Sequence, residues 1–312
     1  MKKNRLTIEG PLSTLFCAIT VLLAPTVSSA QTAAQSVAPS AASAAANAFA
    51  VGSGPTSVAS DGVSIWVTNQ FSNSVTRLAS DGTVLGTFAV GKNPTGVAFD
   101  GTSIWVANNA DDTVTRLGSD GVALGTFAVG DGPEGLLSDA TNIWVANGKG
   151  NSVTKLSGNG TVLGTFAVGK RPVGLASDGA NIWVTNNKSN TVTKLSANGT
   201  VLGTFAVGDG PFGIVFDGAN IWVANFFSGN VMKLGVDGTV LGTFAAGDGA
   251  AGLASDGTNI WVTNNGNNSV MKLSRAGVLL ATYKVGRSPY GVVSVGTNVW
   301  VANSGSNTVS KQ

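Results

Sequence analysis

The sequence contains no histidine, and its single cysteine, Cys17, lies near the N-terminus. Without histidine, no nucleophile can be activated by the imidazole base of the usual catalytic triad. A zinc site would lack the imidazole and thiolate ligands that the metal prefers. One cysteine also allows no internal disulfide. We therefore expect no catalytic triad, no metal site and no cofactor.

Charged residues are scarce as well, at 11% of the chain. The first 30 residues nevertheless have a basic start at residues 2–5, a mostly apolar run at 12–27 and small residues at 28–30. This order is typical of a secretory signal peptide. The apolar run is short and interrupted for a membrane span. We predict a cleaved signal peptide over residues 1–30 and export to the periplasm or the exterior; an uncleaved anchor is the alternative.

Cleavage of residues 1–30 would change the charge balance. The whole chain has 18 basic and 16 acidic residues. The removed segment contains three basic residues and one acidic residue, Glu9, which leaves 15 of each sign and a net charge of zero. A neutral chain has no basic surplus to attract nucleic acid or an anionic membrane. We expect neither as a partner, and no membrane span in the mature chain.

Tryptophan, in contrast, recurs with a strict period of 39 residues. It occupies positions Trp66, Trp105, Trp144, Trp183, Trp222, Trp261 and Trp300. Repeats of 20 to 50 residues are typical of solenoids, propellers and arrays. The segment before them, residues 31–46, is rich in Ala and Ser and is predicted to be a flexible spacer.

Each repeat contains four short runs with strand-like composition, separated by turn residues. In the second repeat the runs are 96–99, 103–108, 113–117 and 122–129. Asp-Gly pairs between the runs favour the turns that close hairpins, and no segment has helical periodicity. Four antiparallel strands form a propeller blade. The sequence thus predicts an all-β fold over residues 47–312, a seven-bladed β-propeller of four-stranded antiparallel blades.

The two ends of the repeat region complement each other. The last repeat stops at Gln312, before its fourth strand. The segment at 47–52 ends in the same four residues, Phe-Ala-Val-Gly, as the fourth-strand run at 125–130. We predict that this N-terminal strand completes the seventh blade, which closes the ring and removes an open sheet edge.

Three residues recur in every blade, and we interpret all of them as structural. The tryptophans are expected to pack between neighbouring sheets. The asparagines that end each second strand, such as Asn108, are expected to bond the backbone of their own loop. The basic residues of the third strands, such as Arg116, are expected to form a solvated face.

The run Ile-Trp-Val-Thr-Asn at 65–69, 182–186 and 260–264, with the Gly-x-x-Pro-x-Gly entry and the Asp-Gly turns, resembles the YVTN-type β-propeller repeat. The match covers roughly residues 47–312. The chain is also similar, more loosely, to streptogramin (virginiamycin B) lyase propellers, which share the Gly-Pro-x-Gly and tryptophan pattern. The chemistry of those enzymes relies on histidine, glutamate and a bound magnesium ion. This chain has no histidine, and beyond residue 30 its only glutamate is Glu134.

Two further motifs carry little chemical information. Asp111 and Asp112 are the only adjacent acidic pair, and we interpret them as a polar loop because no third ligand is evident. The run at 130–135 fits Gly-x-Gly-x-x-Gly, as do 208–213 and 247–252. Here the motif joins strand to strand, so it lacks the helix N-terminus that binds a dinucleotide phosphate.

The loops differ between repeats in an ordered way. If the strands of a blade are named A to D along the chain, the A–B and C–D turns hardly vary, while the D–A and B–C loops vary strongly. In an antiparallel blade the two variable sets emerge on the same face, where a rigid scaffold presents residues for function. The candidate ligand-binding residues on this face are Lys92, Asp131, Glu134, Lys170, Arg171, Phe212, Phe226, Phe227, Arg287 and Tyr290. Neutral drift among copied repeats is the alternative explanation.

These observations predict an exported, non-catalytic binding propeller that acts as a monomer and takes a protein or a small ligand at the mouth of the ring. One alternative is a lyase or hydrolase that uses Glu134, Tyr290 and nearby acids. Another is a structural module of the cell envelope. A protein-binding face would present a flat aromatic patch around Phe226 and Phe227, whereas an enzyme would gather acids around the mouth.

Overall fold

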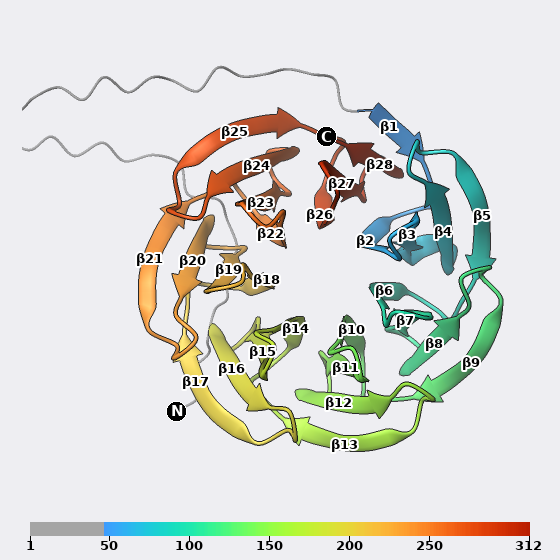
Figure 1. Ribbon diagram of the computed structural model, residues 1–312, viewed down its shortest axis with the longest axis horizontal. Helices are drawn as coiled ribbons and strands as arrows, with labels where there is room; N and C mark the ends of the chain where they lie inside the picture. The colour runs from blue at the N-terminus through green and yellow to red at the C-terminus, as the bar shows by residue number, and fades with distance from the viewer. Residues whose placement is uncertain (1–46) are drawn as a thin grey trace, which may run out of the picture. The chain divides into compact units, whose positions relative to one another are not determined.

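The computed structural model describes residues 47–312, which form seven four-stranded antiparallel sheets arranged around one axis (Figure 1). The predicted seven-bladed propeller is confirmed. The predicted signal peptide and spacer lie outside the described residues. Besides the strands there is a 3-10 turn, η1 (Gln70–Ser72), and residues 47–312 contain no helix long and apolar enough to cross a membrane.

The A strands lie nearest the axis and the B strands follow (Figure 1). The A strands are β2 (Pro55–Ser60), β6 (Pro94–Phe99), β10 (Pro133–Ser138), β14 (Pro172–Ser177), β18 (Pro211–Phe216), β22 (Ala250–Ser255) and β26 (Pro289–Val295). The B strands are β3 (Ser64–Asn69), β7 (Ile104–Asn108), β11 (Asn142–Asn147), β15 (Asn181–Asn186), β19 (Ile221–Asn225), β23 (Asn259–Asn264) and β27 (Asn298–Asn303).

The C strands come next, and the D strands form the rim. The C strands are β4 (Ser74–Ala79), β8 (Thr113–Leu117), β12 (Ser152–Ser157), β16 (Thr191–Ser196), β20 (Asn230–Leu234), β24 (Ser269–Ser274) and β28 (Thr308–Lys311). The D strands are β5 (Val84–Ala89), β9 (Ala123–Ala128), β13 (Val162–Ala167), β17 (Val201–Ala206), β21 (Val240–Ala245), β25 (Leu279–Lys284) and β1 (Asn47–Ala50).

The seventh blade takes its outer strand from the beginning of the repeat region. Strand β1 pairs antiparallel with β28, with Phe49 opposite Val309. The ring of Phe49 lies 5.6 Å from that of Trp300, as Phe127 lies 5.6 Å from Trp105 within the second blade. The seventh blade is therefore paired and packed like the others, and Trp300 packs against Ile65 and Leu78 of the first blade.

The core consists of seven clusters, each of which joins two neighbouring sheets. Trp183, which is fully buried, packs in one cluster with Ile214, Val223 and other aliphatic residues of the following blade. All seven tryptophans are buried in this way, which confirms their structural role. Neighbouring sheets diverge as they extend outward from the axis, which leaves a wedge-shaped space between them. The large indole side chain fills this space and is covered by both sheets.

Six of the tryptophans are also held by an aspartate five residues earlier. Asp100 accepts a hydrogen bond from Trp105 Nε1 at 2.6 Å through one oxygen, and from the amides of Thr102 and Ser103 through the other. The same carboxylate thus closes the A–B turn and fixes the indole. In the seventh blade Val295 occupies this position, so Trp300 lacks that carboxylate.

We expect the Val295→Asp variant to be more stable than the parent at neutral pH. The new carboxylate would accept the Trp300 indole N–H and the turn amides, a gain of about 1 kcal/mol for a hydrogen bond of this type. Urea unfolding at pH 7 measures the difference. Val295→Asn keeps the size but not the charge, and should gain less. Equal stability of parent and Val295→Asp would contradict the expectation.

The basic residues of the C strands, expected to form a solvated face, are half-buried and make specific contacts. The charged groups of all seven, for example Lys194, lie 5.0–5.5 Å from the centre of a tryptophan ring in their own blade. Lys194 Nζ also donates to Val236 O of the next blade at 2.7 Å, and Lys311 Nζ donates to Ser80 O across the seam at 2.8 Å. The sequence interpretation missed these contacts because cross-strand pairing, as of Lys194 with Trp183, places the basic side chains over the indole face.

The asparagines at the ends of the B strands also differ from expectation. Asn108 Nδ2 donates to the hydroxyls of Thr113 and Thr115 on the neighbouring C strand, at 3.0 and 2.8 Å. Asn264 does bond backbone, but in the D–A loop and not in its own loop: its Oδ1 accepts from Gly247 N at 2.9 Å. In the other blades the asparagine therefore ties two strands together.

Candidate functional site

The D–A and B–C loops of each blade lie on one face, as predicted, because their backbones bond to each other. In the fifth blade Phe226 N donates to Gly210 O at 3.0 Å and Phe227 N donates to Asp209 O at 3.1 Å. Equivalent bonds join Lys149 N to Asp131 O in the third blade. The residues that vary between repeats are therefore gathered at one end of the ring.

Hydrogen bonds between blades hold this loop face in place. Asn151, in the left-handed conformation with φ of 51°, accepts from Arg171 N of the next blade at 2.9 Å through Oδ1. Asp112 does the same for Gly132 N at 2.8 Å, while Asp111 accepts from Lys92 N at 2.7 Å. The adjacent acidic pair thus serves the loop structure, in agreement with the sequence interpretation. Loops fixed in this way present a site that is largely formed before a ligand arrives.

A β-bulge at the start of every A strand determines which side chains face the axis. In the third blade Pro133 is opposite Asn147, but Leu136 is opposite Val145, so the inner strand has one extra residue. Bulges of this kind redirect a side chain. The bulge spans the second and third residues of each A strand. The seven residues at the second position are Thr56, Thr95, Glu134, Val173, Phe212, Ala251 and Tyr290. Although the repeats are close copies, this position carries six different amino acids.

These side chains line a central cavity of about 470 Å³. All of them except Ala251 contribute to its wall. Beneath them the A strands approach one another closely: a Cβ at Gly135 would lie 2.2 Å from Val173 O, so only glycine fits there. A ring of aliphatic residues forms the next layer of the wall, namely Val58, Val97, Leu136, Leu175, Ile214, Leu253 and Val292.

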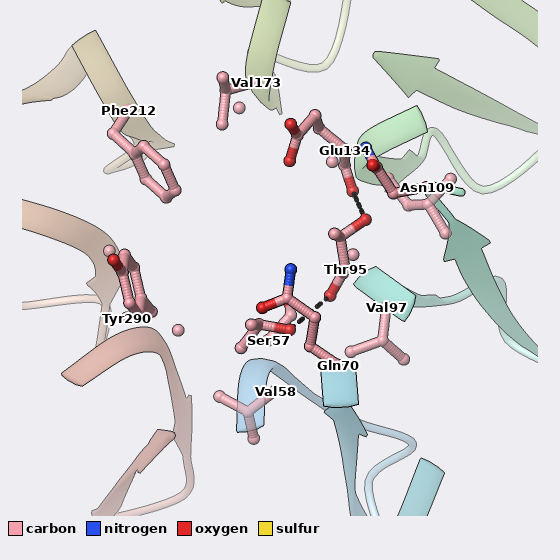
Figure 2. Close-up of a pocket in the computed structure, with 18 of the residues that line it drawn as sticks. Ser57, Val58, Gln70, Thr95, Val97, Asn109, Glu134, Val173, Phe212 and Tyr290 are labelled. Carbon is pink, nitrogen blue, oxygen red and sulfur yellow. Dashed lines mark hydrogen bonds between the residues drawn. The ribbon is translucent and has the colours of Figure 1, made fainter. Parts of the chain in front are cut away.

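One side of the cavity is aromatic. The rings of Phe212 and Tyr290 lie 5.9 Å apart, and both line the cavity (Figure 2). Phe226 lies 6.3 Å from Phe212 on the loop side, and Phe227 meets Phe226 edge to face at 5.3 Å. The four rings form a chain from the cavity wall to the surface, where Phe227 is 74% exposed. The rings of Phe226 and Phe227 meet at 82°, so they are not coplanar as the rings of a flat patch would be.

The other side of the cavity carries a charged pair. Glu134 lies across the opening from the aromatic rings in Figure 2. Its Oε1 is 3.8 Å from Arg171 Nη2 of the next blade, and the Glu134 side chain is 22% exposed. Burial raises the pKa of Glu134, and the positive charges of Arg171 and Lys149 offset only part of this effect. Gly148 leaves room for this side chain, since a Cβ there would lie 2.8 Å from Glu134 Cγ.

The structure separates the ten candidate residues into two groups. Glu134, Arg171, Phe212 and Tyr290 line the cavity, whereas Phe226 and Phe227 lie outside its wall, on the path from Phe212 to the surface. The four others lie on the loop face away from the cavity wall and are exposed; they are Lys92, Asp131, Lys170 and Arg287. Asp131 pairs instead with Lys149 at 3.8 Å.

Sequence reasoning missed several residues of the wall. Thr95, Gln70 and Asn109 line the cavity but were not candidates. Thr95 Oγ1 donates to Glu134 O at 2.9 Å, which joins the second blade to the third at this level (Figure 2). The signal that identifies Thr95 is present in the sequence: it occupies the position after the proline, which differs between blades while its neighbours repeat.

The family model for virginiamycin B lyases matches residues 43–311. The chain belongs to this family. Comparison with proteins of curated function finds no match. The family assignment agrees with the resemblance noted in the tryptophan and Gly-Pro-x-Gly motifs.

Solved structures support the same fold at low sequence identity. A streptogramin B lyase superposes with a TM-score of 0.76 at 18% identity, over 85% of this chain and 96% of that one. A catalytically inactive His-to-Ala variant of Staphylococcus aureus virginiamycin B lyase, solved with quinupristin, gives 0.74 at 17%, over 85% and 98%. Kuenenia stuttgartiensis hydrazine synthase gives 0.74 at 20%, over 83% and 95%. At these identities the likeness concerns the fold.

The donor set of the cavity does not fit the magnesium ion that the lyase resemblance implies. No group of three His, Cys, Asp or Glu side chains comes together within residues 47–312. The one acid on the cavity wall, Glu134, already faces the guanidinium of Arg171. The Arg171 guanidinium would repel a magnesium ion. It also neutralises the negative charge of the carboxylate that the metal would need as a ligand. We therefore derive no catalytic step through a metal.

Proposed function

We propose that this propeller is a non-catalytic binding protein that holds a small, partly apolar ligand in the central cavity of the loop face. The observation that carries the proposal is the second position of the A strands, where near-identical repeats present different side chains into one preformed cavity. A volume of about 470 Å³ lies within the range of small-molecule sites. Drift alone would not require that the varied side chains surround a cavity.

The absence of histidine supports binding without chemistry. The family relative that was solved with quinupristin is a catalytically inactive variant in which a histidine is replaced by alanine. This chain has no histidine at any position, so it lacks the residue type whose loss inactivates that relative. A ligand can be held by shape and by a few polar contacts without a general base.

The aromatic side of the cavity offers a direct test. A small-molecule screen by thermal shift on the full chain should yield compounds that raise the melting temperature. We expect Phe212→Ala to weaken the binding of such compounds about tenfold or more, because it removes a ring that the ligand would cover. Calorimetric titration of each compound measures the change in Kd.

Phe227→Ala is the matched control, because it also removes a phenylalanine but lies outside the cavity wall and is 74% exposed. This variant should bind as the parent does. The proposal fails if compounds bind equally well to the parent and to both Phe212→Ala and Tyr290→Ala. It also fails if a bound compound is turned over by the parent protein.

A further inference from the structure

The Glu134–Arg171 pair leaves most of its hydrogen-bonding capacity unused. The two atoms nearest each other are 3.8 Å apart, whereas a formed Arg–carboxylate hydrogen bond measures about 2.7–2.9 Å. Within residues 47–312 the Glu134 carboxylate accepts no hydrogen bond, and only burial and the charges of Arg171 and Lys149 act on its pKa. Arg171 Nη1 makes one long contact, to Asn187 Oδ1 at 3.3 Å. A carboxylate acceptor and guanidinium donors therefore stand side by side at the cavity wall.

The neighbouring charges lie outside the cavity wall. Lys149, the other cation close to Glu134, lies 3.8 Å from Asp131 on the exposed loop. The adjacent Lys170 is exposed and does not line the cavity. Glu134 and Arg171 are thus the charged groups of the cavity wall, and together they are neutral.

This charge pattern favours a ligand that carries both signs. A ligand with only an ammonium group would place two cations against one carboxylate. A ligand with only a carboxylate would place two anions against one guanidinium. A zwitterion can place its ammonium group on Glu134 and its carboxylate on Arg171, which leaves no charge of the half-buried pair unmatched. Burial raises the pKa of Glu134, so a cationic partner would favour its ionised form.

The opposite wall adds an aromatic requirement. Phe212 and Tyr290 face the cavity, and their ring centres are 5.9 Å apart. The layer of aliphatic side chains that includes Ile214 lies beneath them. A planar apolar group can pack against these rings while the charged end of the same molecule reaches Glu134. The cavity therefore separates a polar half from an apolar half.

Building on the proposed function, we infer that the cavity takes a small zwitterion with an aromatic substituent, the chemistry of a free aromatic α-amino acid. Its ammonium group would contact Glu134, its carboxylate would contact Arg171, and its ring would pack against Phe212 and Tyr290. A peptide does not meet this requirement, because its terminal ammonium and carboxylate are carried by different residues.

Four probes of related structure test this inference by calorimetric titration on the full chain. L-phenylalanine has all three features, L-phenylalaninamide lacks the carboxylate, N-acetyl-L-phenylalanine lacks the ammonium group, and L-alanine lacks the ring. We expect L-phenylalanine to bind, and each of the other three to bind at least tenfold more weakly. Equal affinity for L-phenylalanine and its two blocked derivatives would overturn the inference.

Two pairs of neighbouring charges provide matched variants. Glu134→Gln and Arg171→Gln should each weaken L-phenylalanine binding about tenfold or more. Asp131→Asn and Lys170→Gln remove the same charges from exposed positions nearby, and should leave binding within about twofold of the parent. If the exposed variants weaken binding as much as the cavity variants do, the effect is long-range charge and the inference is wrong.

The inference and the proposed function can fail separately. If L-phenylalanine does not bind but an uncharged compound from the thermal-shift screen does, with a dependence on Phe212, the zwitterion inference is overturned and the binding function stands. If no compound of either kind binds in a manner that depends on Phe212 or Tyr290, both are overturned.

Discussion

The Trp183→Ala variant should lose about 3–5 kcal/mol of its free energy of unfolding, the usual effect of deleting a large buried aromatic side chain. Trp183 is fully buried between the fourth and fifth sheets. Its ring lies 5.6 Å from Phe205, its Nε1 donates to Asp178 at 2.8 Å, and Lys194 Nζ lies 5.0 Å from its centre. The substitution would open a cavity between two blades and remove the donor of a partly buried carboxylate.

Chemical denaturation of the parent and the variant at neutral pH measures this loss. Phe227→Ala is the control, since that ring is 74% exposed and its removal should change the free energy of unfolding by less than about 0.5 kcal/mol. A loss below about 1 kcal/mol for Trp183→Ala would show that neighbouring side chains collapse into the space. The tryptophan would then contribute less to the fold than its burial indicates.

Acid should destabilise the propeller as the pH falls from about 4 towards 2. Six aspartates that accept a hydrogen bond from a tryptophan have a pKa below the ordinary value. Burial is the largest single influence and raises the pKa. Hydrogen bonds from the indole and from the turn amides together outweigh burial, so the net pKa is lowered. This holds for Asp61, Asp100, Asp139, Asp178, Asp217 and Asp256. A carboxyl whose pKa is lower in the folded state stabilises the fold above its unfolded pKa, and this contribution is lost on protonation.

Asp256 allows the effect to be measured at one site. Its pKa is lowered from 3.8 to about 2. Such a shift corresponds to about 2 kcal/mol of stability at neutral pH, which should vanish as the pH falls through about 2. Asp256→Asn should therefore be less stable than the parent at pH 7 and nearly equal to it at pH 2. The exposed loop variant Asp131→Asn is the control, and a stability difference for Asp256→Asn that is the same at pH 7 and pH 2 would contradict the assignment.

The blades were predictable because the information that defines them is local and repeated. The run at 113–117 was predicted as a strand and is β8 with the same bounds, and the runs around it match β6, β7 and β9 within two residues. Asp-Gly or Asn-Gly pairs mark the hairpin turns of most repeats, and seven equally spaced tryptophans set the number of blades. The shared face of the D–A and B–C loops follows from strand alternation alone.

The membership of the site was predictable only in part. Glu134, Phe212 and Tyr290 were candidates because they interrupt a repeated loop pattern, and they line the cavity. Lys92 and Arg287 interrupt the pattern in the same way but lie on the exposed loops. The difference is one of position: Glu134, Phe212 and Tyr290 lie in the bulge at the start of an inner strand, whereas Lys92 and Arg287 precede that strand in the loop. A bulge is a matter of register between two strands, and the composition of one strand does not reveal it.

The basic residues of the C strands show the same limit. The sequence predicts that Lys194 is a surface residue. In the structure it lies over Trp183 and donates to Val236 O of the next blade. Contacts between blades join residues about one repeat apart, so they depend on how sheets pack and not on neighbouring positions along the chain.

The amino-acid sequence by itself determined the period, the strands, the number of blades and the end of the ring at which variation gathers, because each follows from short-range patterns copied seven times. Tertiary structure decided that Glu134 meets Arg171, that Phe212 meets Tyr290 and that both pairs enclose one cavity. The physical reason is ring closure. Seven inner strands crowd around an axis, and only their packing brings side chains from different repeats within contact distance.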